Sequence, residues 1–195
     1  MPRFNEQERE TISKTLMYEG EKLFSTFGLK KVTVDDLAEV ANISKGSFYA
    51  FYQNKEHLFI EINFKLQSEL FIQVENELKN KLDLSKEDLF VLGIKLLLQG
   101  FLKHPILMNI NNSTWDYLKR KLPAEFFDQH KVDDGKMVDK FMGLGIQFTE
   151  SYDFLVKLYQ SIFLYLGEFN GDPDQERITD VIIKGIAKQI IVSEK

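Results

Sequence analysis

Apolar residues recur every three or four positions along almost the whole chain, which is the spacing of one helix face. The first such segment predicts a helix over residues 6–27, with four apolar residues on one side: Ile12, Leu16, Leu23 and Phe27. Gly28 is expected to end this helix in a left-handed conformation. No segment alternates with the period of two that marks a strand. The pattern therefore predicts an all-α protein with about nine helices and no sheet.

Two short helices are predicted next. Thr33 is an N-cap residue, and Asp36 supplies the carboxylate of a capping box three residues later. The first short helix should end near residue 41, and after a tight turn Ser44 should cap a second one over residues 45–52. Two short capped helices with a tight turn between them are the parts of a helix-turn-helix.

A long helix is predicted over residues 55–78, where an apolar residue occupies every fourth position from Leu58 to Leu78. Because an α-helix has 3.6 residues per turn, this stripe drifts around the helix and meets different neighbours along its length. We therefore predict an N-terminal domain of residues 1–54 and a C-terminal domain of residues 55–195, with the helix over 55–78 bridging them.

The C-terminal part carries further start and stop signals. Ser85 and Asp88 form another capping-box pattern, and the helix that follows is predicted to reach residue 103. Pro105 and Pro123 mark two short segments. Three more helices are predicted over residues 136–147, 151–167 and 174–192.

Composition limits the class of protein. The chain has 195 residues and no cysteine, which excludes disulfides and thiolate metal sites. The first residues are charged and lack the apolar segment of a signal peptide. No uncharged stretch approaches the ~18 apolar residues of a spanning helix. We therefore predict a soluble, cytoplasmic protein with no membrane partner.

Net charge argues mildly against nucleic-acid binding. The chain carries −5, and residues 1–60 hold eight Lys and Arg against nine Asp and Glu. No basic domain emerges from this division, whereas many nucleic-acid-binding domains are strongly basic. Any basic surface must be local, so the motif itself has to support a DNA-binding function.

Residues 33–59 read TVDDLAEVANISKGSFYAFYQNKEHLF, which combines the two short helices and their turn into a helix-turn-helix. Small or apolar residues are spaced to pack the helices together: Leu37, Ala38, Ile43 and Phe48. The second helix is predicted to expose residues near its N-terminus, the end that faces bases and phosphates in such motifs: Lys45, Gly46, Ser47 and Tyr49. Glycine in a helix costs about 1 kcal/mol relative to alanine. Gly46 indicates either a close backbone approach to DNA or only a loose first turn.

This segment strongly resembles the TetR family of bacterial repressors, and the preceding LFSTFGLKKVT fits the family too. The resemblance covers about residues 11–59. It implies an all-helical homodimer whose three N-terminal helices bind DNA, and whose C-terminal domain binds a small ligand and makes the dimer. It also implies that Lys45, Gly46, Ser47 and Tyr49 lie at the DNA surface.

By the same resemblance, Thr33 and Lys55 are expected at phosphates, each at the start of a helix. The chain departs from the family at Ala50 and Phe51, where many members have a His and a Tyr that touch phosphates. The hydroxyl of Tyr52 either supplies a missing contact or belongs to the core.

The C-terminal two-thirds are rich in aromatic residues that suit an apolar ligand pocket with a few polar groups. The candidates are Phe101, Trp115, Tyr117, Phe148, Tyr152 and Tyr159. Ordinary core packing explains the same residues. The last two helices, over about 151–167 and 174–192, have enough apolar positions for a dimer interface, unless the last one only completes the core of the monomer.

No catalytic constellation, metal site or cofactor motif is present, because His57, His104 and His130 are far apart and no phosphate loop occurs. We therefore predict a non-enzymatic regulator that needs no cofactor. The primary hypothesis is a homodimeric repressor that binds a double-stranded DNA operator and is released by a small apolar or amphipathic effector. The alternative is a helical protein–protein interaction module, which the acidic charge, Ala50 and Phe51 favour.

Overall fold

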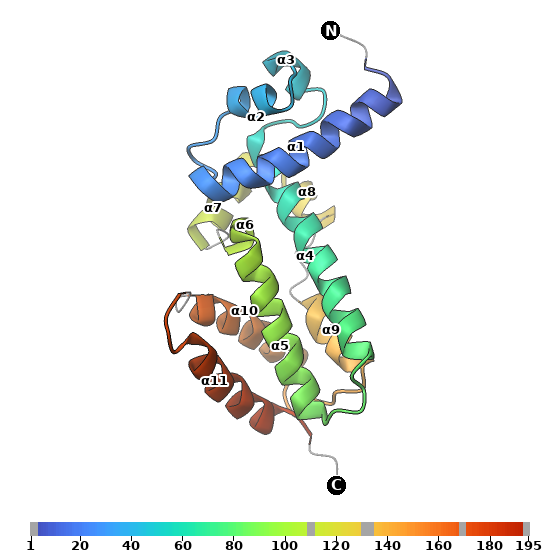
Figure 1. Cartoon of the computed structure of the whole chain (residues 1–195), viewed down its shortest axis with the longest axis vertical. Helices are drawn as coiled ribbons and strands as arrows, with labels where there is room; N and C mark the ends of the chain where they lie inside the picture. Colours follow the sequence, from blue (N-terminus) through green and yellow to red (C-terminus); the bar gives the residue numbers. More distant parts are fainter. Residues whose placement is uncertain (1–3, 109–111, 130–134, 168–170, 193–195) are drawn as a thin grey trace. The chain divides into compact units, whose positions relative to one another are not determined.

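The computed structural model is all-α, as predicted (Figure 1). It describes residues 4–108, 112–129, 135–167 and 171–192. Across these ranges there are eleven helices, two more than the nine or so predicted. The described ranges contain no sheet, and their only extended pairing is one antiparallel bridge between Phe148 and Ile191.

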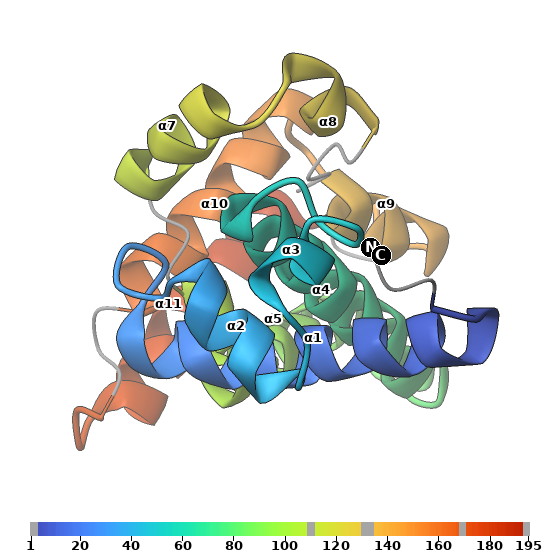
Figure 2. The ribbon, with the colours of Figure 1, turned by 90° about the horizontal axis from the view of Figure 1, so that it is seen from above.

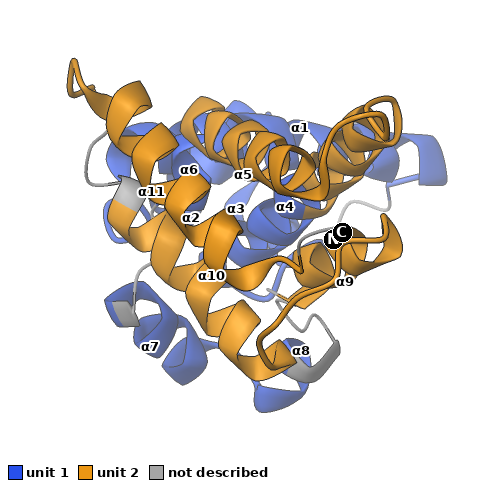
Figure 3. Ribbon diagram, turned by 90° about the horizontal axis from the view of Figure 1, so that it is seen from below, with its two compact units in different colours: residues 1–67, 104–131 blue, residues 68–103, 132–195 orange. Residues whose placement is uncertain are grey.

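The chain forms two compact units, coloured separately in Figure 3. The first comprises Met1–Gln67 and His104–Lys131, and the second comprises Ser68–Lys103 and Val132–Lys195. The predicted bridging helix corresponds to α4 (Lys55–Lys79), which the two units share. The division falls inside α4, between residues 67 and 68, and the first unit recruits a segment from much later in the chain.

Besides the start of α4, the first unit contains six helices: α1 (Glu6–Phe27), α2 (Val34–Val40), α3 (Lys45–Phe48), α6 (Pro105–Met108), α7 (Asn112–Lys121) and α8 (Ala124–Gln129). Its core includes Phe24 on α1 and Phe59 on α4, whose rings meet edge to face at 5.2 Å. Gly20 lets α1 come close to α4, because a Cβ there would lie 3.2 Å from Ile62 and 3.3 Å from Leu58.

The second unit contains the rest of α4 and four helices: α5 (Lys86–Lys103), α9 (Gly135–Gly143), α10 (Tyr152–Gly167) and α11 (Gln175–Ile190). α5 lies centrally, packed on α10 and α11. Two glycines of α5 permit close packing. A Cβ at Gly93 would lie 2.5 Å from Phe141, and one at Gly100 would overlap Leu70.

Local hydrogen bonds explain where the N-terminal helices begin and end. Thr33 and Asp36 form the predicted capping box of α2, and Ser44 caps α3 by accepting from the Ser47 amide. Gly28 ends α1 with the expected positive φ of 78°. Its ψ of 158° differs from the left-handed helical conformation that was predicted.

Three helices differ from the sequence prediction, and the first is α9, which ends at Gly143 rather than at residue 147. The α3 helix ends at Phe48 rather than at residue 52, because the amides of Ala50 and Phe51 donate to carbonyls three residues back and tighten the chain. The α7 helix was not predicted, because its sequence, NSTWDYLKRK, has too few apolar residues to show a helical stripe.

Candidate nucleic-acid interface

The α2–α3 pair has the geometry of a helix-turn-helix. Leu37 and Ala38 on α2 and Phe48 on α3 are buried, as the spacing predicted. The turn between the helices contains Asn42 with a positive φ of 51°, and the Ile43 amide donates to the Ala38 carbonyl at 3.0 Å. These contacts fix how α3 leaves the turn, and therefore which of its residues face outward.

Three of the four predicted surface positions on α3 are exposed, namely Lys45, Gly46 and Tyr49, and half of the Tyr49 side chain is accessible. Ser47 is only 3% exposed, so the prediction that α3 exposes this residue is wrong. Its hydroxyl lies 2.9 Å from the hydroxyl of Ser44, and its amide donates to the same cap. Ser47 therefore holds the start of α3 together.

Nothing within the described chain explains a glycine at position 46. Its φ lies outside the positive range, and a Cβ there would meet only the Ser44 hydroxyl, at an ordinary contact distance of 3.8 Å. Gly46 is the second residue of a four-residue helix capped by Ser44, so a close approach of DNA and a loose first turn both remain open.

Two predicted contact residues already engage neighbouring carboxylates. The ammonium group of Lys45 lies 2.7 Å from the Asp35 carboxylate, whose hydrogen bond raises the pKa of Lys45. The Thr33 hydroxyl donates to the Asp36 carboxylate at 2.8 Å. Hydrogen bonds from the amide and hydroxyl of Thr33 lower the pKa of that carboxyl. Such exposed pairs contribute little energy, so Lys45 can exchange Asp35 for a phosphate at small cost.

Lys55 has a structural role that the sequence did not indicate. Its ammonium group donates to three carbonyl oxygens of the turn between α1 and α2: Leu29 at 2.8 Å, Lys30 at 3.2 Å and Val32 at 2.6 Å. An ammonium group has three N–H donors, so these contacts use all of them. Lys55 thereby fixes the turn that carries Thr33. The sequence gave no signal of this, because the partners lie 23 to 26 residues away.

Arg9 on α1 was missed by the sequence analysis. Its guanidinium donates to the Ala50 carbonyl at 3.1 Å and lies 4.9 Å from the centre of the Phe51 ring. The positive charge of Arg9 therefore lies beside Ala50 and Phe51, the two positions that lack a phosphate-contacting side chain. Tyr52 is 7% exposed, and burial raises the pKa of its hydroxyl, so it belongs to the core.

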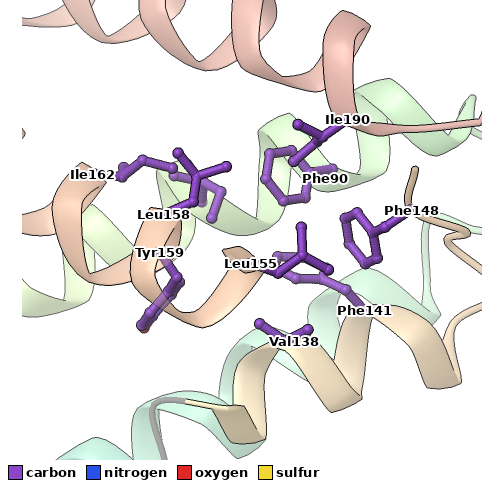
Figure 4. Close-up of a pocket in the computed structure, with 10 residues that line it drawn as sticks. Phe90, Val138, Phe141, Phe148, Leu155, Leu158, Tyr159, Ile162 and Ile190 are labelled. Carbon is purple, nitrogen blue, oxygen red and sulfur yellow. The ribbon is translucent and has the colours of Figure 1, made fainter. Parts of the chain in front are cut away.

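The candidate ligand-pocket residues are divided between the two units. In the second unit, Phe148 and Tyr159 line an apolar cavity together with Phe90, Ile94, Val138, Phe141, Leu155, Leu158, Ile162 and Ile190 (Figure 4). Its volume is about 20 Å³, which is room for a single water molecule. Phe101 lies against the Phe163 ring at 4.9 Å, and Tyr152 is exposed.

Trp115 and Tyr117 lie instead in the first unit. The Trp115 ring packs 5.6 Å from that of Phe127, and the Tyr117 hydroxyl donates to Glu56 at 2.6 Å. The structure therefore does not bring these two residues to the apolar cavity.

The described residues include no group of His, Asp or Glu side chains arranged to hold a metal ion. His130 lies outside them. Among the helices of the described ranges, none is long and apolar enough to cross a membrane.

Residues 16–62 match the model of the bacterial regulatory proteins of the tetR family. The HTH-type transcriptional regulator YhgD of Bacillus subtilis is 38% identical over 74 residues, which are 38% of this chain and 35% of YhgD. The HTH-type transcriptional regulator EthR of Mycobacterium tuberculosis is 26% identical over 84 residues, covering 43% of this chain and 39% of EthR. The chain thus matches little more than a third of the length of these relatives.

Similarity of fold extends over nearly the whole chain. The ketosteroid transcriptional regulator KstR2 of Mycobacterium tuberculosis superposes with a TM-score of 0.60, covering 98% of each chain at 15% identity. At that identity the likeness concerns the fold alone. Residues 16–62 thus carry the helix-turn-helix region of the tetR family of bacterial regulatory proteins, and the fold of the whole chain resembles that of KstR2.

Proposed function

We propose that the protein is a sequence-specific, DNA-binding transcriptional regulator. The observation that carries this proposal is the outer face of α3, a capped helix held on α2 by buried Phe48. It presents Lys45, Gly46 and Tyr49 outward, and a Cβ at Gly46 would make only an ordinary 3.8 Å contact with the Ser44 hydroxyl. A major groove admits a helix in this way. None of the similar proteins named above favours the alternative of a protein–protein module.

The proposed contacts divide into two kinds. Lys45, Gly46 and Tyr49 face the groove, while Thr33 and Arg9 lie at phosphates. Ser47 and Lys55, which the sequence also suggested as contacts, support the site from within the protein. Ser47 orders the start of α3, and Lys55 holds the turn before Thr33.

The experiment selects binding sites from a pool of random duplexes and then measures affinity by fluorescence anisotropy. We expect the wild type to enrich one sequence, and Tyr49→Ala to weaken binding to it with the fold intact. Tyr18→Ala is the matched control, because Tyr18 is an exposed tyrosine of the same unit outside the proposed contact set. Failure to enrich any sequence, or equal affinity of Tyr49→Ala and the wild type, rules the proposal out.

We further propose a homodimer formed through α10 and α11. Both helices carry large apolar side chains that are exposed in the single chain, including Phe154 and Leu164 on α10 and Val181 on α11. Burying such residues between two copies is favourable by roughly 25 cal/mol per Å². Leu164→Glu should shift the protein toward monomers in analytical ultracentrifugation. Leu82→Glu, at an equally exposed leucine outside these helices, should not, and a fully dimeric Leu164→Glu protein would refute this interface.

We also propose that the regulator is a repressor, released from its operator when an apolar or amphipathic effector expands the cavity beside Phe148 and Tyr159. A cavity that holds one water must open to admit such a ligand, so binding would favour an altered conformation. Compounds that raise the melting temperature should also weaken operator binding. Coupling is reciprocal, so operator DNA should weaken compound binding by the same factor. A compound that occupies the cavity and leaves operator affinity unchanged contradicts this mechanism.

A further inference from the structure

The helices α7 and α8 belong to the same compact unit as the helix-turn-helix, although Ser68–Lys103 of the second unit come between them in the sequence (Figure 3). Seen from above in Figure 2, they lie on one side of the start of α4, and α1 lies on the other. This segment follows Pro105, in the part of the chain for which the sequence predicted ligand binding and dimerisation. Its position beside the DNA-binding helices raises the question of what it contributes there.

Polar contacts fasten α7 to the first turn of α4. The Tyr117 hydroxyl donates to the Glu56 carboxylate at 2.6 Å, and Glu56 is only 6% exposed. Burial and this hydrogen bond raise the pKa of Tyr117 to about 12. The side-chain amide of Asn54 donates to the Lys121 carbonyl at 3.5 Å. Asn54 also caps α4 by accepting from the His57 amide. The end of α7 is therefore held next to the N-terminus of α4.

Aromatic packing adds to this attachment. The Phe126 ring on α8 meets the ring of His57 edge to face at 4.8 Å, and stacks with that of Phe64 at 6.3 Å. Both partners are on α4. The segment thus packs along more than two turns of α4.

The last turn of α7 carries three successive cations, Lys119, Arg120 and Lys121, and all three are exposed. The helix dipole favours cations at a helix C-terminus, and this effect alone explains the presence of one or two of the three. Within the described ranges, however, none of the three forms an ion pair with a carboxylate. This contrasts with Lys45, which is paired with Asp35.

We infer that Lys119, Arg120 and Lys121 form a second DNA-binding site, which contacts backbone phosphates beside the groove occupied by α3. This inference rests on the proposed function. The partner chemistry is duplex phosphate, because the cations are clustered and held beside the α4 N-terminus, where free amides also favour an anion. In the described residues they have no carboxylate partner, and the Lys121 ammonium group lies 5.8 Å from the centre of the Tyr117 ring. The contacts carry no sequence information. They supply local positive charge to a chain whose net charge is −5.

The test compares wild type with the triple variant K119Q/R120Q/K121Q on the selected operator and on a random duplex. Each lost phosphate contact should reduce the slope of log affinity against log salt by about 0.9, so by about 2.7 for each subunit. The operator and the random duplex should lose affinity by similar factors. The control K79Q/K81Q/K136Q makes the same change in net charge with exposed lysines of the second unit. It should leave the slope near that of the wild type.

Hydroxyl-radical footprinting provides an independent readout. The wild type should protect backbone positions flanking the α3 site, and the triple variant should lose only those flanks. An unchanged slope and footprint, with Tyr49→Ala still defective, overturns the second site and leaves the proposed function standing. An equal fall in slope for both triple variants also overturns it, because net charge then explains the effect. If the wild type binds no duplex, the proposed function and this inference fail together.

Discussion

The substitution Gly46→Ala separates the stability of the protein from its binding of DNA. A Cβ at this position would meet only the Ser44 hydroxyl, 3.8 Å away, so the added methyl group costs nothing inside the chain. Alanine is favoured over glycine in a helix by about 1 kcal/mol, partly because it restricts the unfolded chain. We expect the free energy of unfolding to rise by about 0.5–1 kcal/mol. For a chain of this length the melting temperature should increase by about 1–4 °C.

Binding should change in the opposite direction. If the backbone at Gly46 lies against DNA, the methyl group forces α3 to retreat and weakens the contacts of Lys45 and Tyr49 as well. A tenfold loss of affinity corresponds to about 1.4 kcal/mol, which is the smallest effect we expect. A more stable protein that binds DNA less well is a combination that general damage to the fold does not produce.

Thermal unfolding followed by circular dichroism, and anisotropy titration of the selected operator, measure the two effects. The control is Gly143→Ala at the end of α9, where a Cβ meets nothing within 4 Å. It should not weaken binding. Unchanged operator affinity of Gly46→Ala would refute the close approach of DNA to this backbone. A loss of stability would refute the conclusion that a methyl group at position 46 fits without a clash inside the chain.

Three further substitutions test contacts within one unit or the other. Lys55→Met leaves three carbonyl oxygens without their charged donor and should lower the free energy of unfolding, measured with urea, by about 1.5–3 kcal/mol. If Lys55 only bound phosphate, the variant would unfold in urea as the wild type does, and the slope of log affinity against log salt would fall by about one. Gly93→Ala places a methyl group 2.5 Å from the Phe141 ring. The overpacking should cost about 1–3 kcal/mol, which cancels or exceeds the gain of about 1 kcal/mol from the higher helix propensity of alanine. A clear rise in melting temperature would contradict this packing. Tyr117→Phe removes the donor to the buried Glu56 carboxylate and should destabilise the protein by about 1.5–3 kcal/mol. Folding raises the pKa of Tyr117 from 10.0 to about 12, so the stability that this hydroxyl adds is complete below pH 10.0. The difference in free energy of unfolding between wild type and variant should therefore shrink as the pH rises to 12. A difference that does not change with pH would contradict this link between protonation and stability.

The sequence by itself determined the elements whose causes are local. The bounds of α1 and α5 agree with the prediction, because apolar periodicity and capping groups act over three or four residues. The capping box of Thr33 and Asp36 and the Ser44 cap were readable for the same reason. Together with the residues that pack α2 on α3, these signals were sufficient to identify the helix-turn-helix.

Only the tertiary structure decided which side chains are buried and which partners they contact. Ser47 and Tyr49 are two residues apart, yet one is buried and the other exposed, which follows from how α3 packs within its unit. Lys55 lies at a helix start, as phosphate-binding lysines do, but its donors are used by carbonyls of a turn more than twenty residues earlier.

The same limit applies to the segment that carries Tyr117. Aromatic content suggested that it lines a ligand pocket, whereas its hydroxyl meets Glu56, 61 residues earlier, within the unit that contains the helix-turn-helix. A hydrogen bond between residues so far apart leaves no periodic trace in the sequence. It depends on which helices the chain brings together when its apolar surfaces are buried.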